Sequence, residues 1–146
     1  MLNHVHHAHL FAANIDASLK FYQEMFGGEI LADLNMAGAR NVFLAIGQGR
    51  LHFYDQPPRD EGRGAIHHIG IQTDNLEALV AHMKAKGVPF RKGMVDFGFW
   101  KYVMAPAPDN VLLELFQIVP EKLPDGDREK LKRIDVFQSP DKKSLG

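Results

Sequence analysis

The chain repeats itself, and this repeat constrains its fold more than any other feature of the sequence. A shift of 61 residues superimposes His6-His7 on His67-His68, and Asn14 on Asn75. A shift of 62 residues superimposes LHFY (51–54) on LELF (113–116), and apolar positions between these matches also align. Two related halves are therefore predicted, residues 4–58 and 66–120.

Each half has the pattern of a strand, a helix and three more strands. In the first half we expect a strand at 4–12, a helix capped by Asn14 or Asp16 that ends at Phe26 before Gly27-Gly28, and strands at 29–34, 41–46 and 51–54. In the second half we expect a strand at 67–73, a helix capped by Asp74 or Asn75 that ends at Lys86 before Gly87, and strands at 89–91, 100–104 and 111–119.

The predicted fold class is α+β, with two βαβββ modules forming a curved mixed sheet around a metal-binding cleft. Residues 1–120 are expected to form a single domain, because 146 residues have room for one compact core. Residues 121–146 are polar and charged and are predicted to be a C-terminal extension, either a solvated appendage or a cover for a sheet edge, with one short helix at 127–134 and a mobile end.

Composition excludes several functions. Apolar residues make up 45% and charged residues 24%, as in ordinary globular proteins, and the net charge of −1 gives no reason to expect nucleic acid or an anionic membrane as a partner. No apolar run has the length of a transmembrane helix, and we expect no signal peptide. The chain has no cysteine, which excludes disulfides and thiolate ligands and fits a cytoplasmic protein.

Strand parity groups the histidines, because residues two apart on a strand share a face. Four sets follow: His7, His9 and Phe11; Arg50, His52 and Tyr54; His68, Gly70 and Gln72; Leu112, Glu114 and Phe116. The repeat makes His7 equivalent to His68 and His52 equivalent to Glu114. If a pseudo-twofold axis relates the halves, these four residues converge on one divalent ion, and nitrogen and carboxylate donors suit Fe, Mn, Co, Ni or Zn.

The alternative interpretation is that these are ordinary strand residues. A lone histidine in a strand is more often hydrogen-bonded or on the surface than bound to a metal. Glu114 differs, because it interrupts the apolar run VLLELF, where an unpaired buried carboxylate is costly. A cation close to Glu114 is therefore expected.

The motifs resemble those of the vicinal oxygen chelate superfamily (glyoxalase, bleomycin resistance protein and extradiol dioxygenase). The resemblance rests on His7, Asn14 and Phe21-Tyr22 followed by MFGGEI, on HHIGIQTDN, and on PDNVLLELFQ, and it covers roughly residues 3–118. It implies His7, His68 and Glu114 as metal ligands. His52 matches a position that is glutamate in glyoxalase I, which puts a two-glutamate mechanism in doubt. Relatives often form homodimers, so a homodimer is expected.

The resemblance implies a metal-dependent, glyoxalase-like lyase or isomerase acting on a small molecule. A metal that chelates two substrate oxygens acidifies the adjacent C–H, and a nearby base must then take the proton. The candidate catalytic residues are Glu114 and His9.

Three other functions stay open. Two histidines and one carboxylate also suit an Fe(II)-dependent extradiol ring-cleaving dioxygenase, with Tyr102 near the tyrosine of those enzymes. Thiol transfer to fosfomycin would use basic residues such as Arg50 and Lys101. A non-catalytic drug-binding resistance protein would not need the ligand set. In each case, aromatic residues and one arginine are the predicted substrate pocket: Phe11, Arg50, Tyr54, Trp100, Tyr102 and Phe116.

Overall fold

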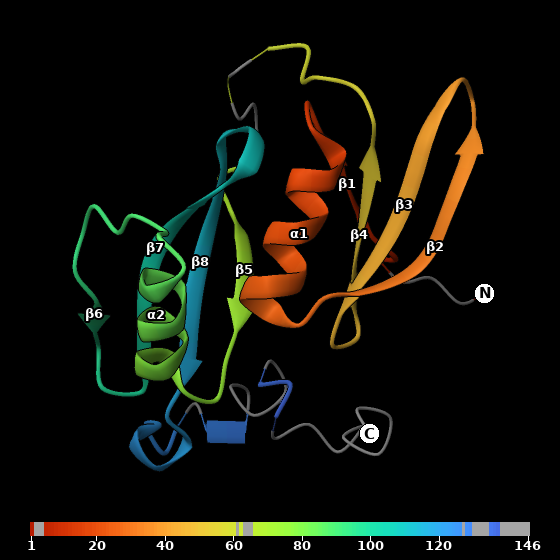
Figure 1. Ribbon diagram of the computed structural model, residues 1–146. Helices are drawn as coiled ribbons and strands as arrows, with labels where there is room; N and C mark the ends of the chain where they lie inside the picture. Colours follow the sequence, from red (N-terminus) through yellow and green to blue (C-terminus); the bar gives the residue numbers. More distant parts are fainter. Residues whose placement is uncertain (2–4, 61, 63–65, 127, 130–134, 138–146) are drawn as a thin grey trace. The chain divides into compact units, whose positions relative to one another are not determined.

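The structure is a computed structural model that describes residues 1, 5–60, 62, 66–126, 128–129 and 135–137. Its contacts divide the chain into two compact units. Unit 1 comprises Met1–Arg63 with Ala107–Asn110, and unit 2 comprises Gly64–Pro106 with Val111–Gly146. Each unit is built around one four-stranded sheet and one α-helix (Figure 1).

Unit 1 contains the first βαβββ module. Its elements in chain order are β1 (Ala8–Phe11), α1 (Ile15–Phe26), β2 (Glu29–Met36), β3 (Ala39–Ile46) and β4 (Gly49–Tyr54). The strand order in the sheet is β1-β4-β3-β2. Strand β1 runs parallel to β4, and the other pairs are antiparallel, so the sheet is mixed.

The predicted caps of α1 are confirmed. Asn14 is the N-cap, and its side-chain Oδ1 accepts a hydrogen bond from the backbone N–H of Ala17 at 3.0 Å. At the other end Gly27 adopts φ 65°, in the left-handed region that favours glycine, and its N–H donates to the carbonyl of Gln23. Local sequence signals thus determine where this helix begins and ends.

The two faces of the unit 1 sheet differ in character. Val42, Leu44 and Phe53 point to the helix side and are almost fully buried, with the ring of Phe53 5.3 Å from that of Tyr22 on α1. The alternate residues of β3 and β4 lie on the opposite face. That face carries His52 and its cross-strand neighbour Phe43.

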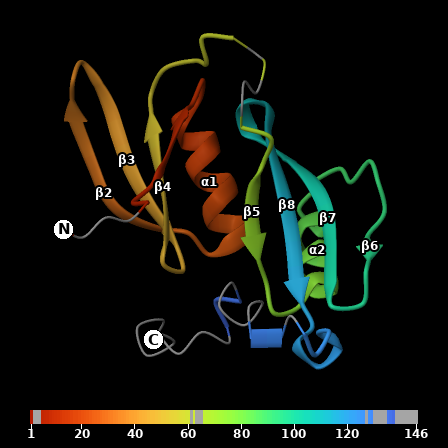
Figure 2. The same ribbon diagram turned by 180° about the vertical axis from the view of Figure 1, so that it is seen from behind.

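Unit 2 contains the second module and repeats this plan (Figure 2). Its elements are β5 (Ile69–Gln72), α2 (Leu76–Ala85), β6 (Val95–Asp96), β7 (Trp100–Ala107), the 3-10 turn η1 (Pro108–Asn110), β8 (Val111–Ile118) and the 3-10 turn η2 (Pro120–Lys122). The strand order is β5-β8-β7-β6, with β5 parallel to β8. The predicted α+β fold of two βαβββ modules is confirmed; that residues 1–120 act as a single domain stays a prediction.

Helix α2 also begins at the predicted cap. Asn75 accepts from the N–H of Ala78 at 3.0 Å, and Gly87, with φ 86°, follows the helix. The core of unit 2 consists of buried apolar side chains from α2, β7 and β8: Leu76, Met83, Val103, Ala105, Leu113 and Leu115. The alternate residues of β8, Glu114 and Phe116, therefore lie on the face away from the core.

Three strand predictions need correction. The strand expected at 89–91 is wrong: the pairing strand is β6, four residues farther on, where Val95 lies opposite Tyr102 and Asp96 opposite Lys101. Pro89 has no N–H for a ladder, which disfavours pairing there. Strands β1 and β5 also begin later than expected, so His7 and His68 each lie one residue before their strand.

The turn η1 belongs to unit 1 although the strands on either side of it lie mostly in unit 2. Asp109 has φ 60°, an uncommon conformation for a residue other than glycine. Its carboxylate accepts hydrogen bonds from the N–H of Ala13 at 3.2 Å and from the hydroxyl of Ser18 at 3.4 Å. These contacts hold the turn beside the start of α1.

Most of the described residues after 120 are exposed, and two are buried; that residues 121–146 form a polar extension stays a prediction. Leu123 and Asp135 are 4% and 2% exposed. Asp135 accepts a hydrogen bond from Nε2 of Gln72 at 2.7 Å, and Gln72 in turn accepts from the N–H of Val136 at 3.2 Å. The helix expected at 127–134 and the last nine residues lie outside the described residues, apart from 128–129.

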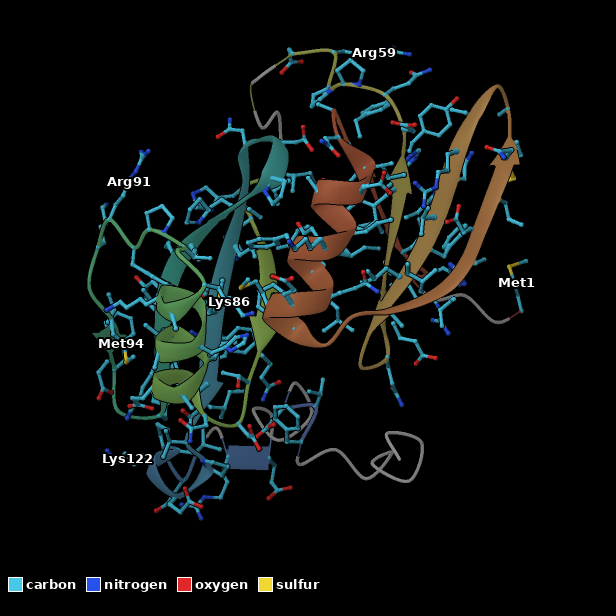
Figure 3. All side chains as sticks on the ribbon, viewed as in Figure 1. Met1, Arg59, Lys86, Arg91, Met94 and Lys122 are labelled. Carbon is cyan, nitrogen blue, oxygen red and sulfur yellow. The ribbon has the colours of Figure 1, made fainter. Side chains whose placement is uncertain are left out.

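Figure 3 marks four residues of unit 2 that follow α2 in the chain. Lys86 lies at the end of α2, Arg91 and Met94 lie on the segment that leads to β6, and Lys122 lies on η2. In the part of the chain that the structure describes, no helix is long and apolar enough to cross a membrane.

Candidate metal centre

Three aromatic rings from neighbouring strands form a stack on the face of unit 1 away from α1. His52 on β4 lies opposite His9 on β1 and opposite Phe43 on β3. The ring centroid of His52 is 4.3 Å from that of His9 and 4.2 Å from that of Phe43, with interplanar angles of 19° and 8°. His7 lies edge-on to this stack, 5.4 Å from His52. The rings of His7, His9 and His52 therefore lie together on this face of the sheet.

A hydrogen bond fixes the ring of His52 from the side. Its Nε2 lies 2.8 Å from Oδ1 of Asn41. The amide nitrogen of Asn41 donates to the backbone carbonyls of Met36 and Ala39 at 2.9 and 3.0 Å. Because His52 and Asn41 are 8% and 3% exposed, this interaction takes place largely out of water.

The environment of this stack favours neutral imidazoles. Burial lowers the pKa of His52, and the neighbouring rings of His9 and His7 lower it further. Burial also lowers the pKa of His9, followed by the effect of His7. Near pH 7 both rings therefore carry a nitrogen lone pair, as metal ligation and proton acceptance require.

The matching position in unit 2 holds a histidine–carboxylate pair. Nε2 of His68 lies 2.9 Å from Oε2 of Glu114, and the other carboxylate oxygen, Oε1, accepts from the indole N–H of Trp100 at 3.3 Å. The side chain of Glu114 is 16% exposed. Both carboxylate oxygens of Glu114 therefore have a polar partner, and a cation close to it stays a prediction.

A second feature recurs in both units. Nδ1 of His6 lies 2.9 Å from Nδ1 of His7, and Nδ1 of His67 lies 2.8 Å from Nδ1 of His68. In each pair the first histidine thus contacts Nδ1 of the second. In unit 2 this arrangement leaves Nε2 of His68 directed at Glu114.

Each unit brings together two of the four predicted ligands: His7 and His52 in unit 1, and His68 and Glu114 in unit 2. Imidazole nitrogens and a carboxylate fit a divalent ion of the iron-to-zinc series. Among the described residues there is no group of three or more His, Cys, Asp or Glu side chains that could hold a metal ion. The donor chemistry fits a metal, and convergence of all four residues stays a prediction.

The pocket residues predicted in unit 1 share the face of the histidine stack. Phe11 lies opposite Tyr54 in the β1–β4 pair, with ring centroids 6.1 Å apart. The hydroxyl of Tyr54 donates to the carbonyl of Ala37 at 2.9 Å. Arg50, two residues before His52, is exposed at the start of β4 and lies opposite Ala45.

In unit 2 the predicted aromatic residues gather beside Glu114. The rings of Trp100 and Phe116 stack with centroids 4.5 Å apart and an interplanar angle of 5°. Tyr102 has the same strand parity as Trp100, so both lie on the face of Glu114. Lys101 has the opposite parity and pairs with Glu77 of α2 at 3.2 Å, so an ion pair already occupies its ammonium group.

Sequence reasoning missed Asn41 and the apolar residues beside it. Asn41 interrupts the apolar segment ARNVFLAI of β3 just as Glu114 interrupts VLLELF, and this signal was available. Leu34 lies opposite Asn41 and is 50% exposed, and Met36, two residues on, is 47% exposed. Only the strand register, which includes a bulge between Ile30 and Ala32, shows that they share the face of His52.

Comparison with known families agrees with this geometry. The model of the Glyoxalase/Bleomycin resistance protein/Dioxygenase superfamily matches residues 4–115. The chain belongs to this superfamily. The matched segment spans the first module and the second module as far as residue 115, so it includes the histidine stack of unit 1 and the His68–Glu114 pair of unit 2.

Curated members of the superfamily and solved structures resemble the chain at low identity. It is 27% identical over 139 residues to the lactoylglutathione lyase of Schizosaccharomyces pombe and 30% identical over 122 residues to that of Arabidopsis thaliana. Both matches cover 76% of this chain, which spans 46% and 43% of the relatives' length, or about half. A fosfomycin resistance protein, FosX, of Listeria monocytogenes, solved with Mn(II) and sulfate, has a TM-score of 0.64 at 19% identity over 84% of this chain and 98% of its own.

Proposed function

We propose that this chain is a metal-dependent, glyoxalase-like enzyme of the lyase or isomerase type. It promotes proton transfer on a small substrate that is chelated to the metal through two oxygens. The observation that carries the proposal is the pair of His68 and Glu114, 2.9 Å apart, on the sheet face that also carries the stacked rings of Trp100 and Phe116. The likeness to two lactoylglutathione lyases supports this reaction class.

Four residues would hold one divalent ion, with Fe, Mn, Co, Ni and Zn as the candidates: His7, His52, His68 and Glu114. When bound, such an ion polarises two substrate oxygens and acidifies the C–H between or beside them. Because both units must contribute ligands, the complete site requires unit 1 of one chain and unit 2 of the same chain or of a partner. A homodimer is therefore part of the proposal. We also propose a cytoplasmic location.

Two residues are proposed to move the substrate proton. Glu114 can exchange a proton through Oε2, while the indole N–H of Trp100 holds Oε1 at 3.3 Å and orients the carboxylate. His9 is the second candidate, because burial and the neighbouring His7 lower its pKa and leave its ring able to accept a proton near neutral pH.

The surrounding residues suit a substrate with an apolar or aromatic body. Phe11 and Tyr54 in unit 1, and Trp100, Tyr102 and Phe116 in unit 2, would line its pocket. The exposed guanidinium of Arg50 is available for a carboxylate on the substrate.

The test begins with metal content. The chain is purified without oxygen, stripped with a chelator, and reloaded separately with Ni, Co, Zn, Mn and Fe. Turnover of the hemithioacetal of methylglyoxal and glutathione is then followed. We expect activity that needs one ion per site and is lost in His68→Ala. A protein that binds no divalent ion would overturn the proposal.

The alternative functions give different results in the same experiment. With Fe(II) and a catechol, oxygen uptake and a yellow ring-cleavage product would favour the dioxygenase, whose chemistry also needs two histidines and one carboxylate. A drug-binding protein would bind an aromatic drug equally well before and after metal removal. The proposed enzyme should show neither behaviour.

A further inference from the structure

The side-chain amide of Asn41 points its oxygen at His52, and its other hydrogen bonds determine this orientation. Its amide nitrogen lies 2.9 Å from the carbonyl of Met36 and 3.0 Å from the carbonyl of Ala39. A carbonyl oxygen only accepts hydrogen bonds, so the NH₂ group must face these two oxygens. Turning the amide over would place its oxygen against both carbonyls and break two buried hydrogen bonds.

This orientation determines which nitrogen of His52 carries hydrogen. Oδ1 of Asn41 accepts only, and it lies 2.8 Å from Nε2 of His52, so Nε2 must be the donor. In a neutral imidazole the other nitrogen then has no hydrogen. Nδ1, the nitrogen that is not bonded to Asn41, therefore holds the lone pair.

The ring cannot rotate easily out of this arrangement. Phe43 and His9 cover its two faces at 4.2 and 4.3 Å, and its side chain is buried. His7, the other predicted ligand of unit 1, lies edge-on at 5.4 Å. A buried partner that holds the second nitrogen of a histidine is the usual outer contact of a metal-bound imidazole.

We infer that Asn41 is a positioning residue for the metal centre: it fixes His52 as the Nε2–H tautomer, so that His52 donates to the ion through Nδ1. This inference rests on the proposed function, because it assigns a donor atom to a ligand proposed there.

Two substitutions separate this role from simple packing. Asn41→Leu keeps a similar volume and removes the acceptor, whereas Asn41→Asp keeps an acceptor for Nε2–H and loses both donors to Met36 and Ala39. A purely structural role predicts that both variants lose stability without a change in the tautomer. The inference predicts that Asp keeps the tautomer and Leu does not.

The first measurement uses the metal-free protein and ¹⁵N-labelled histidine. Long-range proton–nitrogen spectra report which imidazole nitrogen carries hydrogen. We expect His52 as the Nε2–H tautomer in the wild type and in Asn41→Asp, and a mixture of tautomers in Asn41→Leu. Detection of the Nδ1–H tautomer in the wild type would overturn the inference without any variant.

The second measurement is Co²⁺ affinity, read from the visible spectrum of the bound ion. Asn41→Leu should weaken binding by about 10- to 100-fold, the range found when an outer-shell partner of a metal ligand is removed. In a His52→Phe background, which keeps the ring stack and removes both nitrogens, Asn41→Leu should cause no further loss. An unchanged Co²⁺ affinity, or a loss that persists in that background, would overturn the inference.

Failure of the inference is distinguishable from failure of the proposed function. If the wild type binds Co²⁺ and only the Asn41 result fails, the metal centre stands and His52 has another role. If the wild type binds no Co²⁺, the inference and the proposed metal dependence both fall.

Discussion

In unit 2, Nε2 of His68 lies 2.9 Å from Oε2 of Glu114. The first of these residues precedes β5 and the second lies on β8, so the parallel pairing of these two strands brings them together. A pair of this kind has two uses. It satisfies a carboxylate in a mostly apolar strand, and it presents a nitrogen and an oxygen donor on the same side of the sheet.

Glu114→Gln separates these uses. The amide oxygen can still accept from Trp100, but the negative charge that attracts a cation is lost. We expect Co²⁺ or Ni²⁺ affinity to fall by more than about 100-fold, because a ligand is changed rather than its outer partner, and turnover to be abolished. Isothermal titration of the metal-stripped protein measures the affinity.

The matched control is Glu121→Gln on η2, an exposed glutamate outside the proposed site. It removes the same charge and should leave metal affinity unchanged. Equal effects of the two substitutions would mean that only net charge matters, which contradicts a metal site at Glu114.

Trp100→Phe tests the contact on the other carboxylate oxygen. A phenyl ring can keep the stack on Phe116 but has no N–H for Oε1 of Glu114. Since that hydrogen bond is long, at 3.3 Å, we expect a loss of about tenfold in turnover, at the lower end for outer-shell partners. Steady-state kinetics with the loaded enzyme measure the loss, and thermal unfolding should change little.

Trp100→Leu is the companion variant, because it removes both the hydrogen bond and the ring stack. It should lower stability as well as turnover. If Trp100→Phe has wild-type turnover, the indole N–H does not orient Glu114, and the role of this residue is limited to packing.

The parts of this structure that the sequence predicts well are those determined by neighbouring residues. Asn14 and Asn75 cap their helices by binding N–H groups three residues on. The parity that places His9 beside His52 and Gly70 beside Glu114 follows from extended backbone and the repeat. Each of these features needs only a short stretch of chain.

The features that escaped prediction depend on contacts made outside their own strand or turn. Strand β6 has two residues and exists because Val95 and Asp96 pair with β7. Asp135 is buried because it binds Gln72, 63 residues earlier in the chain. Asn41 faces His52 only because the β2–β3 hairpin offers two carbonyls to its amide nitrogen. No local pattern specifies any of these contacts.

The ion pairs around Arg40 predict a pH dependence of stability. Arg40 binds Asp33 through Nε and an Nη atom at 2.9 and 2.7 Å, and it also binds Asp16 at 2.7 Å. The hydrogen bonds that Arg40 donates to Asp33 are the main cause that lowers the pKa of Asp33 below its usual 3.8. The charge of Arg40 also lowers this pKa, whereas desolvation raises it. A lowered folded-state pKa adds stability above the unfolded-state value, and that stability is lost as the pH falls through the folded-state value.

Urea unfolding of the wild type and Asp33→Asn between pH 3 and pH 6 tests this dependence. The wild type should be more stable at pH 6, and the difference should shrink below about pH 4, where the carboxylate is protonated in the unfolded chain. Glu29→Gln, on the same strand and also exposed, is the control. A difference that stays constant over the whole pH range would contradict the role of Arg40.

Removing the hydroxyl of Tyr22 should not lower the stability of the protein, although loss of a buried tyrosine hydroxyl usually does. Its hydroxyl is buried and has no hydrogen-bond partner among the described residues, and burial, followed by the charge of Asp109, raises its pKa well above 10. An unsatisfied buried hydroxyl costs about 1–3 kcal/mol, so Tyr22→Phe should leave the free energy of unfolding unchanged or raise it by about 1 kcal/mol.

Tyr54→Phe is the contrast, because it removes the hydrogen bond to Ala37 and should lower stability by about 0.5–1.5 kcal/mol. Chemical denaturation of both variants at pH 7 measures the two effects, and destabilisation by Tyr22→Phe of more than 1 kcal/mol would mean that the hydroxyl has a bound water or another partner in solution.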